Sequence, residues 1–221
     1  MWVRGVLSAA CLGLVVLVLA STQVIAGQTS SISPEQKYLN PAPHQMSAVI
    51  FGKTLPPLGY VKFCGRNQNE CRFLGGKAEK LQLTSEKWEQ ISQVNAFVQT
   101  KTRPVSDMEL YGVPDYWTYP TNAGDCEDFV LLKKRYLVGM GFSPDILLIT
   151  VVLDETGEGH AVLTVVTDKG DYILDNRRTE ILRWDATGYT FLKRQSQFAA
   201  TGWESLQPLQ SPVLVSITKS H

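Results

Sequence analysis

The sequence lacks an excess of either charge. Its 221 residues include 21 Lys and Arg and 21 Asp and Glu, so the formal net charge at pH 7 is zero. No basic stripe or run of like charges interrupts this balance. Because nucleic-acid binding relies on a concentrated positive surface, we do not expect a nucleic-acid partner.

Cysteine and histidine are also scarce, which disfavours several metal-site patterns. The four cysteines provide one close pair, Cys64 and Cys71, without the second pair or the spaced histidines that a zinc site needs. The EF-hand calcium pattern is absent as well, and the sequence has no internal repeat. Of the three histidines, His44 lies in a weakly patterned region and His221 ends the sequence, so His160 is the candidate for chemistry.

One long hydrophobic run is present, at the N-terminus. Residues 1–4 carry one positive charge, residues 5–20 are almost wholly apolar, and the small residues before Gly27 are typical of a cleavage site. We therefore predict a secretory signal peptide over residues 1–26 and a periplasmic or secreted protein. The alternative is an uncleaved membrane anchor, because the apolar segment is long enough to span a bilayer.

Composition divides the rest of the sequence into three parts. Residues 27–57 are rich in Ser, Pro, Gly and Gln and are predicted to form a linker or N-terminal segment. Residues 58–203 hold the periodic segments and are predicted to form the folded domain. Residues 204–221 are predicted to be a poorly ordered tail.

The predicted export determines how each cysteine is interpreted. Cys11 would leave with the signal peptide, and in an oxidising compartment Cys64 and Cys71 can close a small loop that is rich in turn formers. Cys126 then remains as an unpaired thiol. Such a thiol in an exported protein is a liability unless it is buried in the core or used in chemistry.

Periodicity predicts an α+β fold. Helical spacing of apolar residues marks a helix from Ser85, its expected N-cap, to about Thr100, and the strongest helix runs over residues 124–140. Apolar runs separated by short turns follow, at residues 146–153, 161–167, 171–174 and 189–192. Short connections between successive strands favour an antiparallel sheet, and a helix packed on such a sheet is an α+β arrangement.

Cys126 lies in the first turn of the strongest helix, where free backbone N–H groups favour a thiolate. A thiol nucleophile needs a base, and the base needs an orienting partner. His160 opens one predicted strand and Asp175 closes the next, so neighbouring strands can bring them together. A tight turn at Lys169-Gly170 would place Asp175 near Thr164 instead, so we expect a wider turn or a bulge. Singly, each of the three residues also fits a structural role, whereas the three together favour catalysis.

These residues resemble the bacterial transglutaminase-like cysteine peptidases of the papain and transglutaminase superfamily. The likeness rests on GDCEDF at 124–129, HAVL at 160–163 and LDN at 174–176, with support from DYW at 115–117 and from the cysteine pair. It implies a papain-like fold whose nucleophile begins a helix packed on an antiparallel sheet. It also implies Cys126 as nucleophile, His160 as general base and acid, and Asp175 as the residue that orients the imidazole. Papain-like enzymes often use an amide in the third position, so Asn176 is the alternative to Asp175.

Three carboxylates, Asp125, Glu127 and Asp128, flank the predicted nucleophile. Asp125 is a suitable N-cap, and acids in the first helical turn each stabilise a helix by up to about 1 kcal/mol. Together, however, they would raise the pKa of Cys126 and oppose the helix dipole, a conflict that a bound calcium ion would remove. The LapG-type branch of the family is similar here, which implies that these acids hold calcium.

The LapG-type branch also implies partners. Its members are calcium-dependent periplasmic proteases, so the resemblance implies a cell-surface adhesin as substrate and an inner-membrane regulatory receptor as partner. This sequence has HAVL where that branch has HMVL, and a short segment between Trp117 and Cys126. Trp117 itself is either a substrate-groove residue or a core residue packed against the catalytic helix.

The predicted function is hydrolysis of peptide bonds in a protein substrate through a thioester on Cys126. Two alternatives stay open at this stage. Transfer of the acyl group to an amine would use the same triad, because the shape and water access of the site select the acceptor. A catalytically silent binding module would keep the fold without the chemistry.

Overall fold

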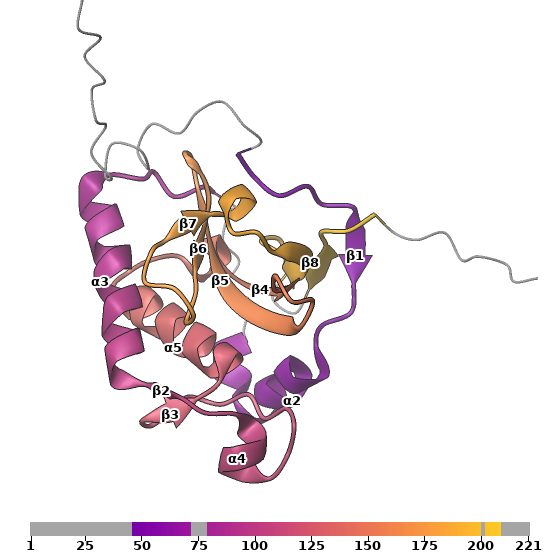
Figure 1. The fold of residues 1–221 in the computed structure, drawn as a ribbon. Helices are drawn as coiled ribbons and strands as arrows, with labels where there is room; N and C mark the ends of the chain where they lie inside the picture. The colour runs from indigo at the N-terminus through magenta and orange to yellow at the C-terminus, as the bar shows by residue number, and fades with distance from the viewer. Residues whose placement is uncertain (1–45, 72–78, 200–201, 209–221) are drawn as a thin grey trace, which may run out of the picture. The chain divides into compact units, whose positions relative to one another are not determined.

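A computed structural model describes residues 46–71, 79–199 and 202–208 of the protein (Figure 1). The predicted signal peptide, residues 1–26, and most of the predicted tail lie outside these ranges. Within the described residues, no helix combines the length and the apolar character needed to cross a membrane.

A seven-stranded antiparallel sheet organises the domain, as Figure 1 shows. Its strand order is β1-β9-β8-β4-β5-β6-β7. Strands β4, β5 and β6 pair in succession as predicted. The sequence did not predict β7, and the fourth predicted strand, β8, pairs with β4 on the other side. The strands are β1 (Gly52–Thr54), β4 (Leu147–Leu153), β5 (Gly159–Thr167), β6 (Gly170–Leu174), β7 (Leu182–Arg183), β8 (Thr190–Gln195) and β9 (Trp203–Ser205). A separate parallel pair joins β2 (Arg103–Pro104) to β3 (Ala123–Gly124).

The helices supply the second layer of the predicted α+β fold, which is confirmed. The α-helices of the described residues are α2 (Leu58–Arg66), α3 (Ser85–Lys101), α4 (Asp107–Tyr111) and α5 (Cys126–Gly139). Short 3-10 helices lie at Gln68–Cys71, Pro144–Ile146 and Trp184–Ala186. Helices α3 and α5 pack against each other, and α5 packs on β5 (Figure 1).

Strand β5 shows how the core is divided between the two faces of the sheet. Alternate residues of a strand point to opposite faces. Ala161 and Leu163 join the apolar cluster that includes residues of α3 and α5, whereas Val162 joins a second cluster that includes Ile173 and Phe191. Both faces of β5 are therefore covered, which explains its nearly continuous apolar sequence.

The domain is wider than residues 58–203. Strand β1 lies inside the predicted linker and pairs with β9, which crosses the predicted boundary at residue 203. Ala48 and Leu206 are buried in the second apolar cluster. Strands of three residues carry too little alternation to stand out in a sequence, which is why these segments were assigned to the linker and the tail.

The starts of the two long helices differ slightly from expectation. Helix α3 is capped by Thr84 rather than Ser85, since the Thr84 hydroxyl accepts a hydrogen bond from the backbone N–H of Lys87 at 3.2 Å. Helix α5 begins at Cys126, two residues later than predicted, and its N-cap residue is Asp125. The thiol therefore stands at the first position of the helix.

We predict that Gly124→Ala destabilises the fold by about 1 to 3 kcal/mol, the usual cost of overpacking. A Cβ atom at Gly124 would lie 2.8 Å from the Cβ of Asp128, which is buried and has no room to move. Gly139 is the matched control, because open space surrounds the position where its Cβ would be. Gly139→Ala should leave the stability unchanged or raise it by up to about 1 kcal/mol. Urea unfolding of both variants measures the difference, and equal stabilities would contradict the predicted clash.

Candidate active site

One cleft of the domain is lined by both Cys126 and His160. Its volume is about 360 Å³. The start of α5 contributes Cys126, and the start of β5 contributes His160. The other residues that line the cleft are Pro57, Pro114, Asp115, Trp117, Asp125, Glu127, Val151, Gly159, Ala161 and Lys193. The fold therefore brings the predicted nucleophile and the predicted base to one site.

His160 and Asp175 form a buried pair. His160 Nε2 lies 2.9 Å from Asp175 Oδ1, and both side chains are almost fully shielded from solvent. Asn176, the alternative third residue, does not bond to the ring, and its Oδ1 is buried without a hydrogen-bond partner in the described structure. The geometry thus assigns the orienting position to Asp175.

The register of β5 and β6 explains how this pair meets without a wide turn. Thr167 pairs with Gly170 and Leu163 with Leu174, so the tight turn lies at residues 168–169, one residue earlier than expected. Extending the register by one residue would place Asp175 opposite Val162, two residues from His160 along the same face. Diagonal neighbours across antiparallel strands lie within reach of long side chains. The expected bulge in this hairpin was therefore wrong.

Further hydrogen bonds hold the Asp175 carboxylate. The Tyr189 hydroxyl donates to Oδ2 at 2.6 Å, and the backbone N–H of Arg177 donates to Oδ1 at 3.0 Å. Burial alone would raise the pKa of Asp175, but the hydrogen bonds from His160, Arg177 and Tyr189 outweigh it and hold this pKa below its ordinary value. The Asp175 carboxylate can thus accept a hydrogen bond from Nε2–H of His160. Nδ1 is then the nitrogen with a free lone pair, and it is buried without a hydrogen-bond partner in the described structure.

Tyr189 is a site residue that the sequence did not reveal. It precedes β8, which lies two strands away from β5 in the sheet order. Its ring packs edge-on against the His160 ring, with centroids 5.7 Å apart. A tyrosine at the start of a short strand carries no local signal for this role, because the contact depends on the whole sheet.

The thiol of Cys126 bonds to an acid rather than to the imidazole. Cys126 is half-buried, and its Sγ donates to Glu127 Oε2 at 3.2 Å. Burial, followed by the negative charge of Glu127, raises the pKa of Cys126 well above its ordinary value, while a hydrogen bond from the Ala161 backbone acts in the opposite sense. The expected contact between sulfur and imidazole is not among the hydrogen bonds of the described residues. The helix N-terminus alone therefore does not produce a thiolate here.

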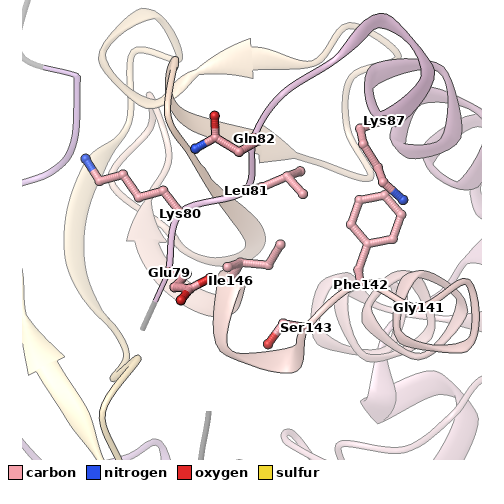
Figure 2. Close-up of a pocket in the computed structure, with 9 residues that line it drawn as sticks. All are labelled: Glu79, Lys80, Leu81, Gln82, Lys87, Gly141, Phe142, Ser143 and Ile146. Atoms are coloured by element: carbon pink, nitrogen blue, oxygen red, sulfur yellow. The ribbon is translucent and has the colours of Figure 1, made fainter. Parts of the chain in front are cut away.

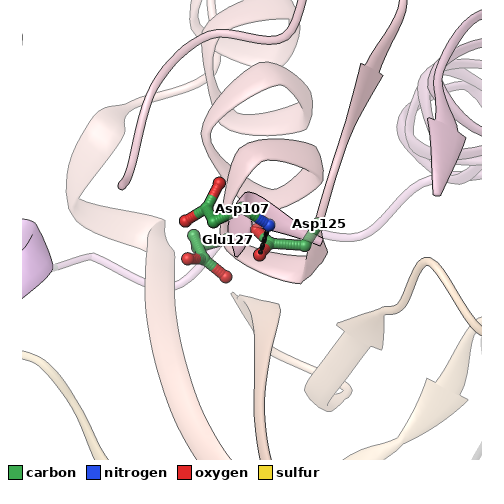
Figure 3. Close-up of side chains that lie close together, drawn as sticks. All are labelled: Asp107, Asp125 and Glu127. Atoms are coloured by element: carbon green, nitrogen blue, oxygen red, sulfur yellow. Dashed lines mark hydrogen bonds between the residues drawn. The ribbon is translucent and has the colours of Figure 1, made fainter. Parts of the chain in front are cut away.

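Three carboxylates, those of Asp107, Asp125 and Glu127, lie close together, as Figure 3 shows. Glu127 also accepts the hydrogen bond from the thiol of Cys126. Each offers one oxygen, and these oxygens all lie within 4.8 Å of one another. Burial, followed by the charge of Asp125, raises the pKa of Glu127 to about 9, and burial also raises the pKa of Asp107. Buried Oδ1 atoms of Asp107 and Asp125 have no hydrogen-bond partner in the described structure. Unpaired buried carboxylate oxygens of this kind fit a hard cation.

This cluster contains Asp107 in place of Asp128, which the sequence analysis included. Asp128 is not part of it: its Oδ1 accepts a hydrogen bond from the backbone N–H of Thr118 at 2.8 Å, and burial raises its pKa to about 8. Asp107 takes its place, because the β2–β3 pairing brings the chain before α4 alongside Asp125. The backbone N–H of Asp107 donates to Asp125 Oδ2 at 3.2 Å, so Asp125 orients Asp107 instead of capping α5 with its side chain.

Trp117 belongs to the wall of the cleft and is also buried. It lines the cleft, yet only 4 % of its surface is exposed. Its Nε1 donates to Asp115 Oδ1 at 2.7 Å, and its backbone oxygen accepts from Arg66 Nη2 at 2.8 Å. Its ring also meets the Tyr60 ring edge-on. The indole is thus a fixed part of the wall of the cleft.

The predicted disulfide is present and lies next to this wall. Cys64 and Cys71 are bonded, with their Cα atoms 5.6 Å apart. The loop that they close carries Arg66, which binds the backbone of Trp117, and Glu70, which accepts a hydrogen bond from the Tyr119 hydroxyl at 2.8 Å. The disulfide therefore stabilises the segment that approaches the cleft from α2.

A larger hollow lies elsewhere, with a volume of about 530 Å³ (Figure 2). Its walls come from residues 79–82, Lys87 and residues 141–146. Lys87 Nζ lies over the Phe142 ring at 4.6 Å from its centroid. None of the predicted catalytic residues lines this hollow, so the smaller cleft is the candidate active site on chemical grounds.

We predict that Tyr189→Phe lowers the free energy of unfolding at pH 7 by about 1.5 to 3 kcal/mol, the usual contribution of a hydrogen bond to a charged group. Because the pKa of Asp175 is depressed, its ionised form stabilises the fold above the ordinary pKa of about 3.9. This contribution disappears as the pH falls, so the gap from wild type should close in acid. Tyr136→Phe on the exposed side of α5 is the matched control. Urea unfolding from pH 7 to pH 3 measures the difference in free energy of unfolding between the variant and the wild type. A difference that does not change with pH would show that Tyr189 contributes by packing alone.

Comparison with known proteins identifies the family of the chain. The family model of the bacterial transglutaminase-like cysteine proteinases matches residues 50–211, which is more than half of the chain. Among solved structures, Legionella pneumophila LapG is 30 % identical over 48 % of this chain and 64 % of its own, with a TM-score of 0.43. The chain thus spans less than two thirds of that protein's length.

Calcium-bound Legionella pneumophila LapG is 26 % identical over 57 % of this chain and 73 % of its own, with a TM-score of 0.47. None of the curated proteins compared with the chain matches it. On the strength of the family match, the chain belongs to the bacterial transglutaminase-like cysteine proteinases, a family of cysteine peptidases.

Proposed function

We propose that this protein is an exported, calcium-dependent peptidase that hydrolyses peptide bonds of a protein substrate through a thioester on Cys126. The observation that carries the proposal is the cleft lined by both Cys126 and His160, together with the buried bond between His160 and Asp175. Nucleophile, base and orienting acid are the three groups that such a reaction needs.

The geometry supports the following sequence of steps. The sulfur of Cys126 attacks the carbonyl carbon of the scissile bond, and Nδ1 of His160 takes the thiol proton. The C–N bond then breaks while His160 returns the proton to the leaving amine, so a thioester remains. Water, activated by the same nitrogen, hydrolyses the thioester and restores the thiol. The free backbone N–H groups at the start of α5 would stabilise the oxyanion that forms on the carbonyl oxygen.

Asp107, Asp125 and Glu127 fit a calcium ion, because buried carboxylate oxygens converge there without partners of their own. When bound, the ion would supply positive charge that favours ionised carboxylates and lowers the pKa of the neighbouring thiol. Glu127 links the proposed calcium ion to the thiol, since its side chain accepts the hydrogen bond from Cys126 when no ion is bound. A thiol released from this bond would be available to His160.

The disulfide supports the proposed location. A bond between Cys64 and Cys71 persists in an oxidising compartment, such as the periplasm or the outside of the cell. The signal peptide proposed for residues 1–26 would lead the protein there. A substrate in that compartment is a surface or secreted protein. An adhesin as substrate and an inner-membrane receptor as regulator are the proposals that the LapG-type resemblance adds.

We predict that Cys126→Ala abolishes cleavage, so that the substrate appears uncut on the surface of cells that carry the variant. Comparative proteomics of surface and secreted proteins, wild type against variant, would identify it. The control is Lys87→Ala, a change in the larger hollow, and this variant should cleave the substrate as the wild type does. Mass spectrometry of the product separates the chemistries. Two fragments indicate hydrolysis, whereas a joined species would replace the proposal with acyl transfer, and an unchanged protein pattern would favour the silent module.

We also predict that a calcium chelator lowers the melting temperature and slows alkylation of Cys126 by iodoacetamide, and that added calcium restores both. Asp107→Asn removes one proposed ligand and should raise the calcium concentration needed at least about tenfold, which corresponds to about 1.4 kcal/mol. Glu109→Gln, on the exposed side of the same short helix, is the matched control. Chelation that changes neither melting nor alkylation would rule out the calcium site.

A further inference from the structure

The turn that leads into β5 is built around a buried carboxylate. Residues 154–158 join β4 to β5, and His160 is the second residue of β5. Asp154 Oδ1 accepts hydrogen bonds from the Thr156 N–H at 2.9 Å, from the Thr156 hydroxyl at 2.7 Å and from the Glu158 N–H at 2.9 Å. Only 3 % of the Asp154 side chain is exposed. One carboxylate oxygen thus fixes the shape of the turn, and Oδ2 is left for a partner from another segment.

Arg177 is the partner of that second oxygen. Its Nη1 donates to Asp154 Oδ2, and its backbone N–H donates to Asp175 Oδ1 at 3.0 Å. Asp175 Oδ1 is also the oxygen that lies 2.9 Å from His160 Nε2. One residue therefore contacts the orienting acid through its backbone and the turn before the histidine through its side chain. The base and its acid are joined twice, once directly and once through Arg177 and the turn.

A second link runs from the other oxygen of Asp175 to the same turn. The Tyr189 hydroxyl donates to Asp175 Oδ2 at 2.6 Å. The Arg178 guanidinium lies over the Tyr189 ring, 5.1 Å from its centroid, and forms an ion pair with Glu155 of the turn. Half of the Glu155 side chain is exposed, and exposed ion pairs contribute little. The link through Arg177 is the stronger of the two, because the carboxylate that it binds is buried.

The sheet itself leaves the start of β5 less firmly held than its middle. The pairing of β6 with β5 reaches Leu163 at this end, so His160 lies beyond that ladder and pairs with Val152 of β4 on its other side. The turn at 154–158 is also longer than the turn at 168–169, and a longer loop loses more entropy when its ends are fixed. An anchor between this turn and the segment after β6 therefore acts where the strand pairing stops.

We propose that Arg177 is a positioning residue that holds the turn at 154–158, and with it His160, against Asp175. Its side chain takes over from the β5–β6 ladder at the point where the ladder ends. The imidazole then keeps its orientation while substrate enters the cleft. The catalytic meaning of this inference rests on the proposed function, whereas the contacts of Arg177 do not.

Arg177→Met tests the proposal, because it removes the side-chain donor and keeps the backbone N–H that bonds to Asp175. With calcium present, alkylation of Cys126 by iodoacetamide should slow about 10-fold, and kcat on the substrate identified by proteomics should fall by about 10- to 100-fold with little change in KM. The Nε2–H proton of His160, followed by NMR after nitrogen-15 labelling of histidine, should exchange faster with water. The melting temperature should fall by at most about 4 °C, because the Arg177 side chain is 44 % exposed.

A double-mutant cycle with Asp154→Asn separates positioning from a general loss of structure. Asparagine keeps an acceptor oxygen for the donors of the turn but removes the charge that Arg177 binds. If Arg177 acts through Asp154, the double variant should be no slower in alkylation than the slower single variant, whereas independent effects would multiply and contradict the proposal. Arg177→Lys should restore most of the rate, because a single contact to a carboxylate needs the charge rather than the guanidinium fork.

Arg183→Met is the matched control. The ion pair of Arg183 with Asp185 joins residues two apart in the sequence, through Nε at 2.6 Å and Nη2 at 2.7 Å. This variant should leave alkylation and Nε2–H exchange unchanged. The proposal is overturned if Arg177→Met keeps both at wild-type values, or if both change only in step with the melting temperature. A wild-type protein that cuts no substrate would refute the proposed function, while alkylation and NMR would still decide the role of Arg177.

Discussion

The hydrogen bond between His160 and Asp175 is the interaction on which the site depends, and the register of two strands sets it. The pairing of β5 with β6 brings Asp175 to the diagonal position from His160. A shift of one residue would turn the carboxylate to the other face of the sheet, because side chains alternate along a strand. The apolar residues on both faces of β5 and β6 prevent such a shift, since it would exchange two packed layers. Core packing and catalytic geometry are therefore fixed by the same pairing.

A second constraint is the negative charge around Cys126. A helix N-terminus favours an anion by about 1 kcal/mol, and by at most about 2 kcal/mol when partly buried. Burial and the neighbouring carboxylates act against ionisation more strongly, as the pKa of about 9 for Glu127 and the raised pKa of Cys126 indicate. In the absence of a cation, the acids therefore oppose ionisation of the thiol and of Glu127. The reactivity of the thiol thus depends on a positive charge that offsets the negative charge of Asp107, Asp125 and Glu127.

Local patterns in the sequence predicted the parts of the site that depend on single elements. Helical periodicity and the glycine before Cys126 placed the thiol at the start of a helix, and turn formers separated the strands that carry His160 and Asp175. Asp107 and Tyr189 were missed because each reaches the site through pairings between distant segments, namely β2 with β3 and β8 with β4. Asp128 was assigned to the metal site because it is adjacent in sequence, whereas its position in the helix turns it toward Thr118. The residue spacing does not reveal which of three adjacent acids faces a cleft.

The buried carboxylate of Asp175 has to stay ionised in order to orient the imidazole. A carboxylate shielded from water needs several favourable contacts for this, and Asp175 has the Tyr189 hydroxyl, the Arg177 N–H and the imidazole. These contacts come from the residue before β8, the segment after β6 and the start of β5, so the ionisation of Asp175 depends on three separate parts of the sequence. The orientation of the predicted base is therefore a property of the assembled sheet rather than of the strand that carries it.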